Sequence, residues 1–418
     1  MFGKKQPEVL VVGAGPVGLL AALLLAKHGV RVEIVDKEER RAGHSYALAL
    51  HSQTLALFNT LDLLDKVLEQ CYRVQTVGLY EGIERKAELQ LSALRPEHAF
   101  IAVLQQNTFE GILEEALKEH DVKVQWNHRI DHLLLHDEHV SLAKNRLDME
   151  SLGYIIARTE KVVMKSYKME VPFVIGADGH SSYVRKSVDI DFNTAGETQH
   201  YAVFEFKTDY DLQNEMRLDF FDNTANVLWP MPDGYCRWSF QLLDYEASEA
   251  SRKKDRFELQ IGAEKIPMLD EDHLYEFLAE RAPWFEGSID EIRWRLLVRF
   301  ERRLASAFGK GRVWLAGDAA HLTGPAGIQS MNVGLREAKD LADNIALILQ
   351  KGETFELLEE YNRERLAEWR YMLGLKGGLT VGKQTDSWIG KHSEQLLSCI
   401  PASSGDLAKL AEQIGLKA

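Results

Sequence analysis

Three glycines and an acidic residue form the clearest chemical pattern near the start of this 418-residue sequence. Gly13, Gly15 and Gly18 have the spacing G-x-G-x-x-G, and Asp36 follows Gly18 by 18 residues. In such a pattern the first glycine permits a tight turn, the second lets the backbone approach a pyrophosphate, and the third lets a helix pack closely on a strand. A carboxylate at Asp36 can accept hydrogen bonds from ribose hydroxyls. The pattern therefore predicts a dinucleotide-binding site.

Two later stretches place polar residues directly after apolar runs. GADGHSSYVR (176–185) carries Asp178 and Gly179, although an Asp-Gly pair at the end of a strand is commonly only a turn. In GRVWLAGDAAHLTGPAGIQSMNVG (311–334), Gly317 and Asp318 precede a loop that leads into a helix. A carboxylate there can bind a polyol chain, and the free N–H groups of a helix start can face an electron-rich carbonyl edge. A flavin needs such separate partners for its ribityl chain and its pyrimidine ring.

The elements that must position these motifs are strands and helices in alternation, which predicts an α/β protein. An apolar run at Val9–Val12 fits a buried parallel strand, a helix follows to Gly29, and Val30–Val35 forms a second strand. Further along, the periodicity predicts helices at 52–69, 105–120 and 268–281, a long helix after Asn332 and a last helix with Asp406 as its N-cap. It predicts strands at 122–130, 171–175 and 313–316. A hairpin at 73–95, a meander at 131–170 and a mainly β stretch at 190–290 are also predicted.

The composition excludes several classes of protein. Hydrophobic residues make up 45% and charged residues 27%, as in soluble globular proteins. The net charge of −14 argues against a general nucleic-acid binder or a protein of anionic membrane surfaces. Cys71, Cys236 and Cys399 form no C-x-x-C pair, which favours a cytoplasmic location. No metal site is predicted, because the three cysteines show no recognisable zinc spacing.

Residues 9–26 carry no charge and follow Lys4 and Lys5, a combination that superficially resembles a signal peptide or a membrane span. Three glycines and Pro16 stand in this window where a spanning helix would have leucine. We therefore predict neither a signal peptide nor a membrane span.

The three motifs together resemble those of a known family. GAGPVG (13–18) with Asp36, GADGHSSYVR (176–185) and GDAAHLTGPAGIQSMN (317–332) occur in the order found in single-component flavoprotein aromatic hydroxylases. These are the para-hydroxybenzoate hydroxylase-like, class A FAD-dependent monooxygenases, and the resemblance runs from residue 8 to about residue 350. It implies FAD as cofactor and NAD(P)H as transient reductant. It also implies that O2 adds to the reduced flavin, and that the resulting C4a-hydroperoxide hydroxylates an aromatic or polyketide-like small molecule.

The resemblance also implies a fold. We expect a Rossmann-like FAD-binding domain of the para-hydroxybenzoate hydroxylase and glutathione reductase type, with an inserted antiparallel β-sheet substrate domain and C-terminal helices. The FAD-binding domain would comprise residues 1–72, 98–189 and 288–345, the β-rich substrate domain residues 73–97 and 190–287, and the C-terminal helical segment residues 346–418. Whether the protein is a monomer or a dimer stays open.

The motifs carry the family's cofactor contacts onto this chain. Pro325 would lie beside the isoalloxazine ring, and Asp178 belongs to a signature associated with both FAD and NAD(P)H. Gln106 matches a family glutamine that reaches the flavin, with an exposed helix cap as the alternative. The expected cofactor-binding residues are Gly13, Gly15, Pro16, Val17, Gly18, Asp36, Lys37, Gln106, Asp178, Gly317, Asp318, Pro325, Gly327, Ile328, Met331 and Asn332.

Three positions depart from the family pattern. Tyr46 and Gln53 stand where arginines are common, and Arg40 or Arg41 could supply a missing cation. Ile328 occupies a turn that is usually richer in glycine, where it would crowd the flavin edge or shift the loop.

The substrate is expected between the flavin ring and the inner face of the β-rich domain. Pro325 and Arg237 are the candidates near the reacting atoms, with a surface arginine as the alternative for Arg237. No acid–base triad is expected, and His321 fits a role in loop structure better than one as a base. The pocket candidates, for which a place in the domain's own core is the alternative, are Phe204, Phe206, Trp229, Met231, Trp238 and Phe240.

Two other functions stay open on the sequence. One is a non-oxygenating FAD-dependent oxidoreductase of the reductase type, and the other is a non-catalytic FAD-binding redox sensor. A flavin halogenase is disfavoured, because WPMPDGYCRW (229–238) does not match the W-x-W-x-I-P signature.

Overall fold

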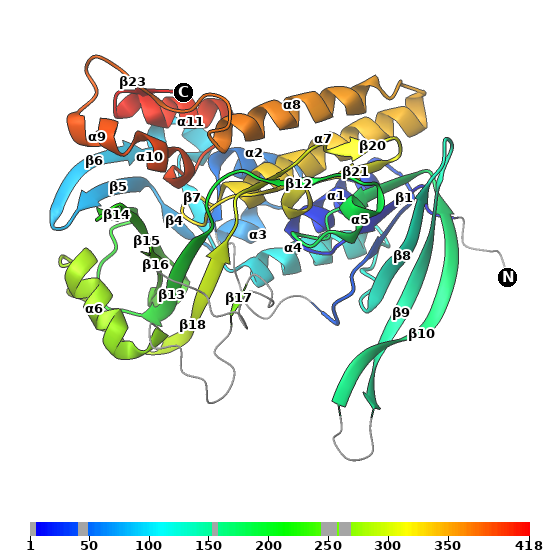
Figure 1. Ribbon diagram of the computed structural model, residues 1–418, viewed down its shortest axis with the longest axis horizontal. Coiled ribbons are helices and arrows are strands. Elements are labelled where there is room, and N and C mark those ends of the chain that lie inside the picture. The colour runs from blue at the N-terminus through cyan, green and yellow to red at the C-terminus, as the bar shows by residue number, and fades with distance from the viewer. Residues whose placement is uncertain (1–5, 41–48, 153–157, 244–256, 259–268) are drawn as a thin grey trace.

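The computed structural model describes most of the chain (Figure 1). The described residues are 6–40, 49–152, 158–243, 257–258 and 269–418. Tyr46, which stands in place of a family arginine, and Arg41, a candidate for the missing cation, lie outside these ranges.

A mainly parallel sheet with the strand order β2-β1-β11-β21-β20 carries the three motifs at its ends. β1 (Val9–Val12) pairs in parallel with β2 (Val32–Val35) and β11 (Phe173–Gly176), and β11 pairs in parallel with β21 (Val313–Leu315). The short edge strand β20 (Gly309–Lys310) is antiparallel. β1, β11 and β21 are continuous apolar runs, as expected for strands buried on both faces.

Three helices pack around this sheet. α1 (Pro16–Lys27) begins with a proline, which suits the first turn of a helix because backbone N–H groups have no acceptor within the helix there. α1 contacts both α4 (Gln106–Glu119) and α7 (Gln329–Lys351). α7 begins before Asn332, earlier than predicted, because the left-handed residue Ile328 ends the preceding loop. The apolar face predicted for α7 is buried at Ala338, Leu341, Ala342 and Ile345.

A second, three-stranded antiparallel sheet connects α4 to β11. It consists of β8 (His128–Leu135), β9 (Val140–Leu152) and β10 (Arg158–Val171), and Figure 1 shows it projecting from the body of the molecule. This is the predicted meander. The strand predicted at 122–130 is wrong over most of its length, because Asn127, with φ +57°, interrupts the extended backbone just before β8.

The largest sheet has eight strands in the order β17-β18-β13-β16-β15-β14-β5-β6. Only β14 and β5 pair in parallel within it. The predicted hairpin is β5 and β6, with Gly82 at φ +58° in its turn. The strands are β5 (Thr76–Glu81), β6 (Glu84–Gln90), β13 (Gln199–Lys207), β14 (Glu215–Phe221), β15 (Thr224–Pro230), β16 (Tyr235–Leu242), β17 (Phe257–Glu258) and β18 (Ile292–Phe300).

β18 belongs to this sheet, although we assigned residues 288–345 to the FAD-binding part. Its hydrogen bonds run along β13, with Gln199 opposite Phe300 and Phe206 opposite Ile292. The rest of the division into domains stays a prediction.

Different helices cover the two faces of the eight-stranded sheet. α6 (Glu271–Arg281) covers one face and packs there with aromatic side chains of β13 and β16. The other face packs against the C-terminal helices α9 (Ser387–Lys391), α10 (Ser393–Cys399) and α11 (Ser404–Gln413), as Figure 1 shows. α8 (Glu356–Met372) joins α7 to this C-terminal segment. The C-terminal helices therefore form one wall of the interior of the molecule.

Two helix predictions need correction. The helix predicted at 52–69 is broken into α2 (Ser52–Thr60) and α3 (Leu64–Leu68), because Asp62 adopts φ +60°. The N-cap of α11 is Ser403, and Asp406 instead lies buried in its first turn. The remaining short elements are β3 (Ala49–Leu50), β4 (Tyr72–Val74), β7 (Ile101–Val103), α5 (Tyr183–Ser187), β12 (Phe192–Thr194), β19 (Arg303–Ala305), β22 (His321–Leu322), β23 (Thr380–Val381) and β24 (Leu416–Lys417).

Within the described ranges, no helix has the length and apolar character needed to cross a membrane. The same residues contain no group of three or more His, Cys, Asp or Glu side chains that could hold a metal ion.

Candidate functional site

A cavity of about 300 Å³ opens where the carboxyl ends of β1, β11 and β21 meet. This is the place where parallel α/β sheets bind their ligands, because the loops after neighbouring strands converge there. The lining residues come from the three motifs and from α4 and β18: Gly15, Pro16, Val17, Gln106, Ala177, Gly179, His180, Phe300, Ala316, Asp318, Thr323, Gly324, Pro325, Ile328, Ser330 and Met331. The structure thus brings half of the predicted cofactor residues together in the lining of one cavity.

The three glycines of the first motif have different surroundings. A Cβ on Gly13 would lie 2.2 Å from the carbonyl oxygen of Ala177, and one on Gly18 would lie 2.0 Å from the carbonyl oxygen of Gly13. These two glycines are therefore required by packing. A Cβ on Gly15 would meet nothing within 4 Å, so Gly15 leaves an open cradle at the N-terminus of α1. Free N–H groups and the positive end of the helix dipole suit a pyrophosphate at that place.

Asp36 lies at the end of β2 beside this cradle. Its Oδ2 accepts a hydrogen bond from the N–H of Ala14 at 2.7 Å, and its Oδ1 accepts one from Glu38 N–H at 2.8 Å. The carboxylate thereby ties β2 to the glycine-rich turn. Lys37 is exposed, and its carbonyl accepts a hydrogen bond from Lys161 Nζ. The contacts of Asp36 and Lys37 with a cofactor stay predictions.

Asp178, in the second motif, caps a short helix. Its carboxylate accepts hydrogen bonds from Ser182 Oγ at 2.5 Å and from Tyr183 N–H at 2.7 Å, both at the start of α5. Burial raises the pKa of this carboxyl group, against the effect of its hydrogen bonds. Asp178 does not line the cavity, whereas its neighbours Gly179 and His180 do. The turn that we weighed as an alternative is therefore present.

Asp318, in the third motif, lines the cavity directly. Its Oδ1 accepts a hydrogen bond from Ser330 Oγ at 2.7 Å, which links the end of β21 to the start of α7. Gly317 precedes it with φ +65°, and a Cβ there would lie 2.9 Å from Val17 Cγ2. The loop can take this shape only with glycine at 317.

Two residues predicted to face the flavin lie elsewhere in the structure. Gly327 packs against the C-terminal segment, where a Cβ would lie 2.8 Å from the carbonyl oxygens of both Ser398 and Ile400. The amide of Asn332 accepts hydrogen bonds from His51 N–H and Thr54 Oγ1, each at 2.8 Å, and donates to the carbonyl oxygens of residues 49 and 328. Neither residue lines the cavity. Both instead connect the loop before α7 to other segments of the protein.

Ile328 lines the cavity from a left-handed backbone conformation, with φ 47° and ψ 36°. A β-branched side chain is rare there, because its Cβ crowds the backbone, at a cost of about 1–2 kcal/mol. The substitution noted in the sequence therefore falls on a position whose backbone favours glycine. The loop keeps the glycine-type shape, and the isoleucine side chain narrows the cavity.

Gln106 and Gln53 have different surroundings. Gln106 lines the cavity at the start of α4, and its Nε2 donates to Glu110 Oε1 at 2.8 Å. Gln53, where the family commonly has arginine, lies outside the cavity lining, with Nε2 3.5 Å from the carbonyl oxygen of Ser403.

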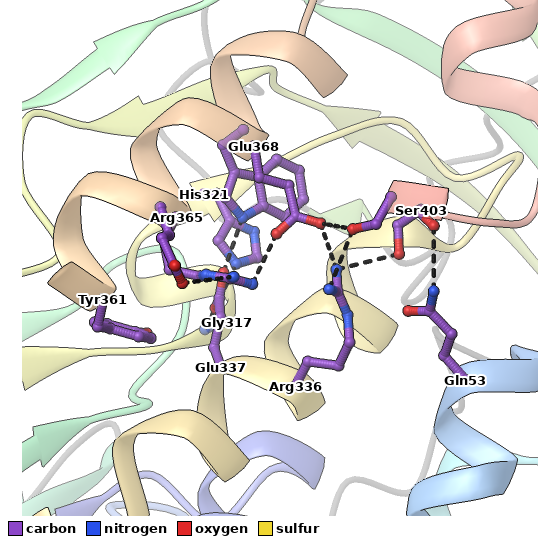
Figure 2. A network of polar contacts seen from close by, with 12 residues as sticks. Gln53, Gly317, His321, Arg336, Glu337, Tyr361, Arg365, Glu368 and Ser403 are labelled. Carbon is purple, nitrogen blue, oxygen red and sulfur yellow. Dashed lines mark hydrogen bonds and ion pairs between the residues drawn. The ribbon is translucent and has the colours of Figure 1, made fainter. Parts of the chain in front are cut away.

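A buried carboxylate that we did not single out from the sequence supports the third motif (Figure 2). Glu337 of α7 has no exposed side-chain surface, and its Oε2 accepts hydrogen bonds from Gly317 N–H and His321 Nε2, each at 2.8 Å. Its Oε1 accepts a third hydrogen bond, also at 2.8 Å, from Trp369 Nε1, and the His321 ring stacks on Trp369 at 3.7 Å. His321 is therefore held within the loop's support, in keeping with a structural role.

The same network connects α7 to α8 and the C-terminal segment. Arg336 and Arg365 donate to the two carboxylate oxygens of Glu368 at 2.5 and 2.7 Å, and Figure 2 shows Ser403 beside Arg336. Burial opposes ionisation of Glu368, but the two guanidinium groups lower the pKa of its carboxyl group. The C-terminal segment is thus fixed by charge as well as by apolar contact.

A second cavity, of about 160 Å³, adjoins the first and shares Gly324 and Pro325 with it. The eight-stranded sheet, the segment after β18 and α10 each supply part of its wall. The lining residues are Gln199, Tyr201, Ala225, Gln241, Arg302, Gly324, Pro325, Ala326, Glu394, Gln395, Ser398 and Cys399. We expected a substrate against the inner face of this sheet, but sequence patterns did not indicate these lining residues, because they come from segments far apart in the chain.

The apolar residues proposed for the substrate pocket fall on two faces of the sheet. Phe204, Phe206, Trp238 and Phe240 point toward α6 and form the core there. Trp229 and Met231 point toward the C-terminal helices but are packed in that core. None of the six lines the first cavity or the second. The pocket prediction is corrected, and the alternative of a core position applies.

Arg237 also lies away from both cavities. Its Nη2 donates to Glu205 Oε2 at 2.6 Å, and Arg293 Nη1 donates to Glu205 Oε1 at 3.1 Å. The Arg237 guanidinium also lies 4.7 Å from the ring centroid of Trp294. Burial lowers the pKa of Arg237, while Glu205 opposes this change. Arg237 therefore lines neither cavity, and its place near the flavin stays a prediction.

Comparison with known proteins identifies the family. Residues 6–373 match the family described as "FAD binding domain". A 6-methylpretetramide 4-monooxygenase of Streptomyces rimosus is 28% identical over 363 residues, which cover 86% of this chain and 59% of that protein. A para-nitrophenol 4-monooxygenase of a Pseudomonas species is 24% identical over 369 residues, which cover 85% of this chain and 82% of that protein. The chain thus spans less than two thirds of the first relative's length.

Solved structures show the same fold. The crystal structure of p-nitrophenol 4-monooxygenase from Pseudomonas putida superposes with a TM-score of 0.70 at 21% identity and covers 98% of this chain and 94% of that one. A ternary complex of aklavinone-11 hydroxylase with FAD and aklavinone gives a TM-score of 0.69 at 20% identity and covers 98% and 73%. These matches confirm the predicted fold class. The match over residues 6–373 shows that this chain belongs to the FAD binding domain family, with FAD as its cofactor.

Proposed function

We propose that the chain is an FAD-dependent monooxygenase that hydroxylates an aromatic small molecule, with NAD(P)H as transient reductant and O2 as co-substrate. The main support is the pair of adjoining cavities, because the loop residues Gly324 and Pro325 line both of them. One cavity has the cradle of a dinucleotide site, and the other lies against the inner face of the large sheet. A substrate in the second cavity and FAD in the first would thus both contact the loop at Gly324 and Pro325.

The residues around the first cavity fit FAD. The open backbone at Gly15 would hold the pyrophosphate, and Asp318 would hold the ribityl chain. The start of α7, with Ser330 and Met331, would lie near the ring system. When bound, FAD supplies the redox chemistry of NAD(P)H oxidation and O2 activation.

The chain's own part in this function is positioning and exclusion of water. Glu337 holds Gly317 through its N–H, and Ser330 orients the Asp318 carboxylate toward the cavity. The sheet and α10 form two sides of the second cavity, which lowers the access of water to a ligand between them. No described side chain needs to act as a nucleophile in this arrangement.

The purified protein tests the proposal directly. Flavin absorbance is measured first, and NAD(P)H consumption in air is then followed with and without phenols. Oxidation that a phenol stimulates, coupled to a hydroxylated product, supports the proposal. A colourless protein that cannot be reconstituted with FAD would refute it, as would flavin reduction that never yields a hydroxylated product.

Asp318→Ala tests the assignment of the third motif. A hydrogen bond to a charged group contributes about 1.5–3 kcal/mol, so we expect FAD affinity to fall roughly 10- to 100-fold. The measurement is flavin fluorescence during titration of the apoprotein. Asp272→Ala on the exposed start of α6 is the control and should leave affinity unchanged. Equal affinity of both variants would contradict the assignment.

We also propose a reducing, cytoplasmic location. All three cysteines are free in the structure, and Cys236 and Cys399 are buried. Fractionation of the source cells tests this, and recovery of the protein from an oxidising compartment would contradict it.

A further inference from the structure

The second cavity contains polar groups that have few partners within the protein. Tyr201, Gln199 and Arg302 line it, and the side chains of Tyr201 and Gln199 make no hydrogen bond with any described residue. Burial raises the pKa of the Tyr201 hydroxyl well above its ordinary value, so this group stays a neutral donor. Glu394, the carboxylate in the lining, is exposed and therefore stands at the solvent side. The interior of the cavity thus offers donors to a ligand.

Arg302 is the cation among these groups. Its Nη2 donates to the carbonyl oxygen of Leu373 at 2.7 Å, which uses one of the five N–H donors of a guanidinium. Its Nε is enclosed and has no partner among the described residues, and Arg302 forms no ion pair with any of their carboxylates. The neighbouring arginines differ, because Arg299 and Arg303 both pair with Glu301.

An unpaired, partly buried guanidinium is unfavourable, because desolvation is not offset by an opposite charge. Burial accordingly lowers the pKa of Arg302. A planar fork of this kind binds carboxylates and other anionic oxygens with two parallel hydrogen bonds. The alternative is that Arg302 has only a structural role, through its hydrogen bond to the carbonyl oxygen of Leu373. That role uses one N–H donor and gives no partner to the others.

The size of the cavity limits what can bind beside Arg302. A cavity of about 150 Å³ is known to hold one benzene ring, whereas drug-sized ligands occupy about 300–1,000 Å³. At about 160 Å³, the second cavity fits one substituted ring. That ring would lie next to Pro325, which also lines the cofactor cavity.

We propose that the substrate is a single-ring aromatic compound with an ionised oxygen, a phenolate or a carboxylate, and that Arg302 selects it with Tyr201 as a second donor. This proposal rests on the proposed function, since it names the substrate class of the same site. It makes Arg302 a determinant of specificity, whereas the cofactor is held by other residues.

Binding of matched probes to the FAD-loaded protein tests the proposal. Benzoate and benzamide have nearly the same shape and differ in charge, and 4-nitrophenol and 4-nitroanisole differ in the ability to ionise. Affinities are measured by calorimetry and by the change in flavin absorbance at a pH where 4-nitrophenol is ionised. We expect benzoate or 4-nitrophenolate to bind at least about 10-fold more tightly than its neutral counterpart. The pair that shows this preference identifies the acidic group. Anthracene-2-carboxylate, with three fused rings, should bind much more weakly than benzoate.

Arg302→Met should abolish the preference for the anion, so that the ratio of the two affinities approaches one. Arg302→Lys keeps the charge without the fork and should retain part of the preference, which provides a second reading if Arg302→Met folds poorly. Arg299→Met is the matched control, since Arg299 pairs with Glu301 and lies outside both cavities. It should keep the full preference.

Two results would overturn the proposal. One is a wild-type protein that binds neither anion or does not prefer either of them to its neutral partner. The other is an Arg302→Met variant with normal FAD content that keeps the preference. FAD content and substrate-free NAD(P)H oxidation are measured on the same samples, so a failure of the proposed function is recognised separately. Equal binding of the three-ring acid would overturn the single-ring part.

Discussion

Replacement of Glu337 by glutamine tests whether a buried carboxylate holds the third motif in place. Glutamine has nearly the same size, so the packing of α7 against the loop is kept. The carboxylate accepts three hydrogen bonds, two at Oε2 and one at Oε1, from donors on Gly317, His321 and Trp369. An amide can accept at only one end, and its NH2 group must face a donor at the other.

The magnitude follows from this mismatch. The favourable orientation keeps the amide oxygen at the Oε2 position, where it still accepts from Gly317 and His321. Trp369 Nε1 then faces an NH2 group, and a buried donor left without a partner costs about 1–3 kcal/mol. Loss of the charge weakens the two remaining hydrogen bonds, while removal of a buried charge offsets part of that loss. We expect Glu337→Gln to lower the free energy of unfolding by about 2–3 kcal/mol.

Urea unfolding of the apoprotein, followed by circular dichroism, gives this change in free energy. FAD titration of the same variant should also show weaker binding, because the Gly317 N–H is less firmly held. Glu360→Gln on the exposed side of α8 is the control, where Glu360 lies 4.0 Å from Arg363, and it should change stability by less than about 0.5 kcal/mol. A Glu337→Gln change as small as that of the control would refute the reasoning.

Further predictions concern backbone space and pH. Gly15→Ala should fold normally, since its Cβ meets no protein atom, but it should bind FAD more weakly, because that Cβ enters the space expected for the pyrophosphate. Gly18→Ala should lose folded protein, because its Cβ would clash with the carbonyl oxygen of Gly13. Thermal melting and flavin fluorescence measure the two effects. Burial lowers the pKa of His51 to about 3. Below pH 6.5 the imidazole of His51 is therefore protonated in the unfolded state but stays neutral in the folded state. Stability should therefore fall by about 2 kcal/mol from pH 6.5 to 5, and His51→Gln should remove this loss in urea titrations. Burial raises the pKa of Asp219 to about 7, so the folded state keeps a proton that the unfolded state releases, and stability is lost as pH rises through 4 to 7. Asp219→Asn should accordingly stabilise the protein by roughly 4 kcal/mol at pH 8 and by little at pH 4; a pH-independent difference would contradict this.

The parts of the site that short motifs encode were predictable from the sequence. The glycine spacing and the polar residues after apolar strands depend on local chemistry, and the structure brings Gly15, Asp318 and Pro325 into one cavity. Local patterns also identified the helix that carries Gln106 and the hairpin around Gly82.

Positions that depend on which way a strand faces were not predictable. Alternation shows that Phe204 and Trp238 are buried, but it does not tell whether their face meets the cofactor side or α6. Arg237, by contrast, faces the same side of the sheet as Tyr201 and Gln241, but Glu205 on the neighbouring strand matches its charge and it lines neither cavity.

Residues that act across long separations were also missed. The second cavity needs α10 beside Tyr201, and Glu337 needs the loop at Gly317, contacts that no periodicity reports. Asn332 was expected near the flavin because it matches the third family motif, yet its direction on α7 turns its amide toward His51.

The hydrogen bonds of the Gln329 side chain have a consequence for the order in which the protein folds. Its Nε2 donates to three carbonyl oxygens, those of Leu397, Ile400 and Ala402, which follow it by 68, 71 and 73 residues. These acceptors are made 68 to 73 residues after Gln329, whereas the contact of Gly13 with Ala177 in the cradle involves only residues made earlier. During synthesis the dinucleotide cradle can therefore fold well before the loop around Ile328 reaches its final shape. FAD could be captured at its pyrophosphate end first, with the ring end enclosed only when the C-terminal helices dock.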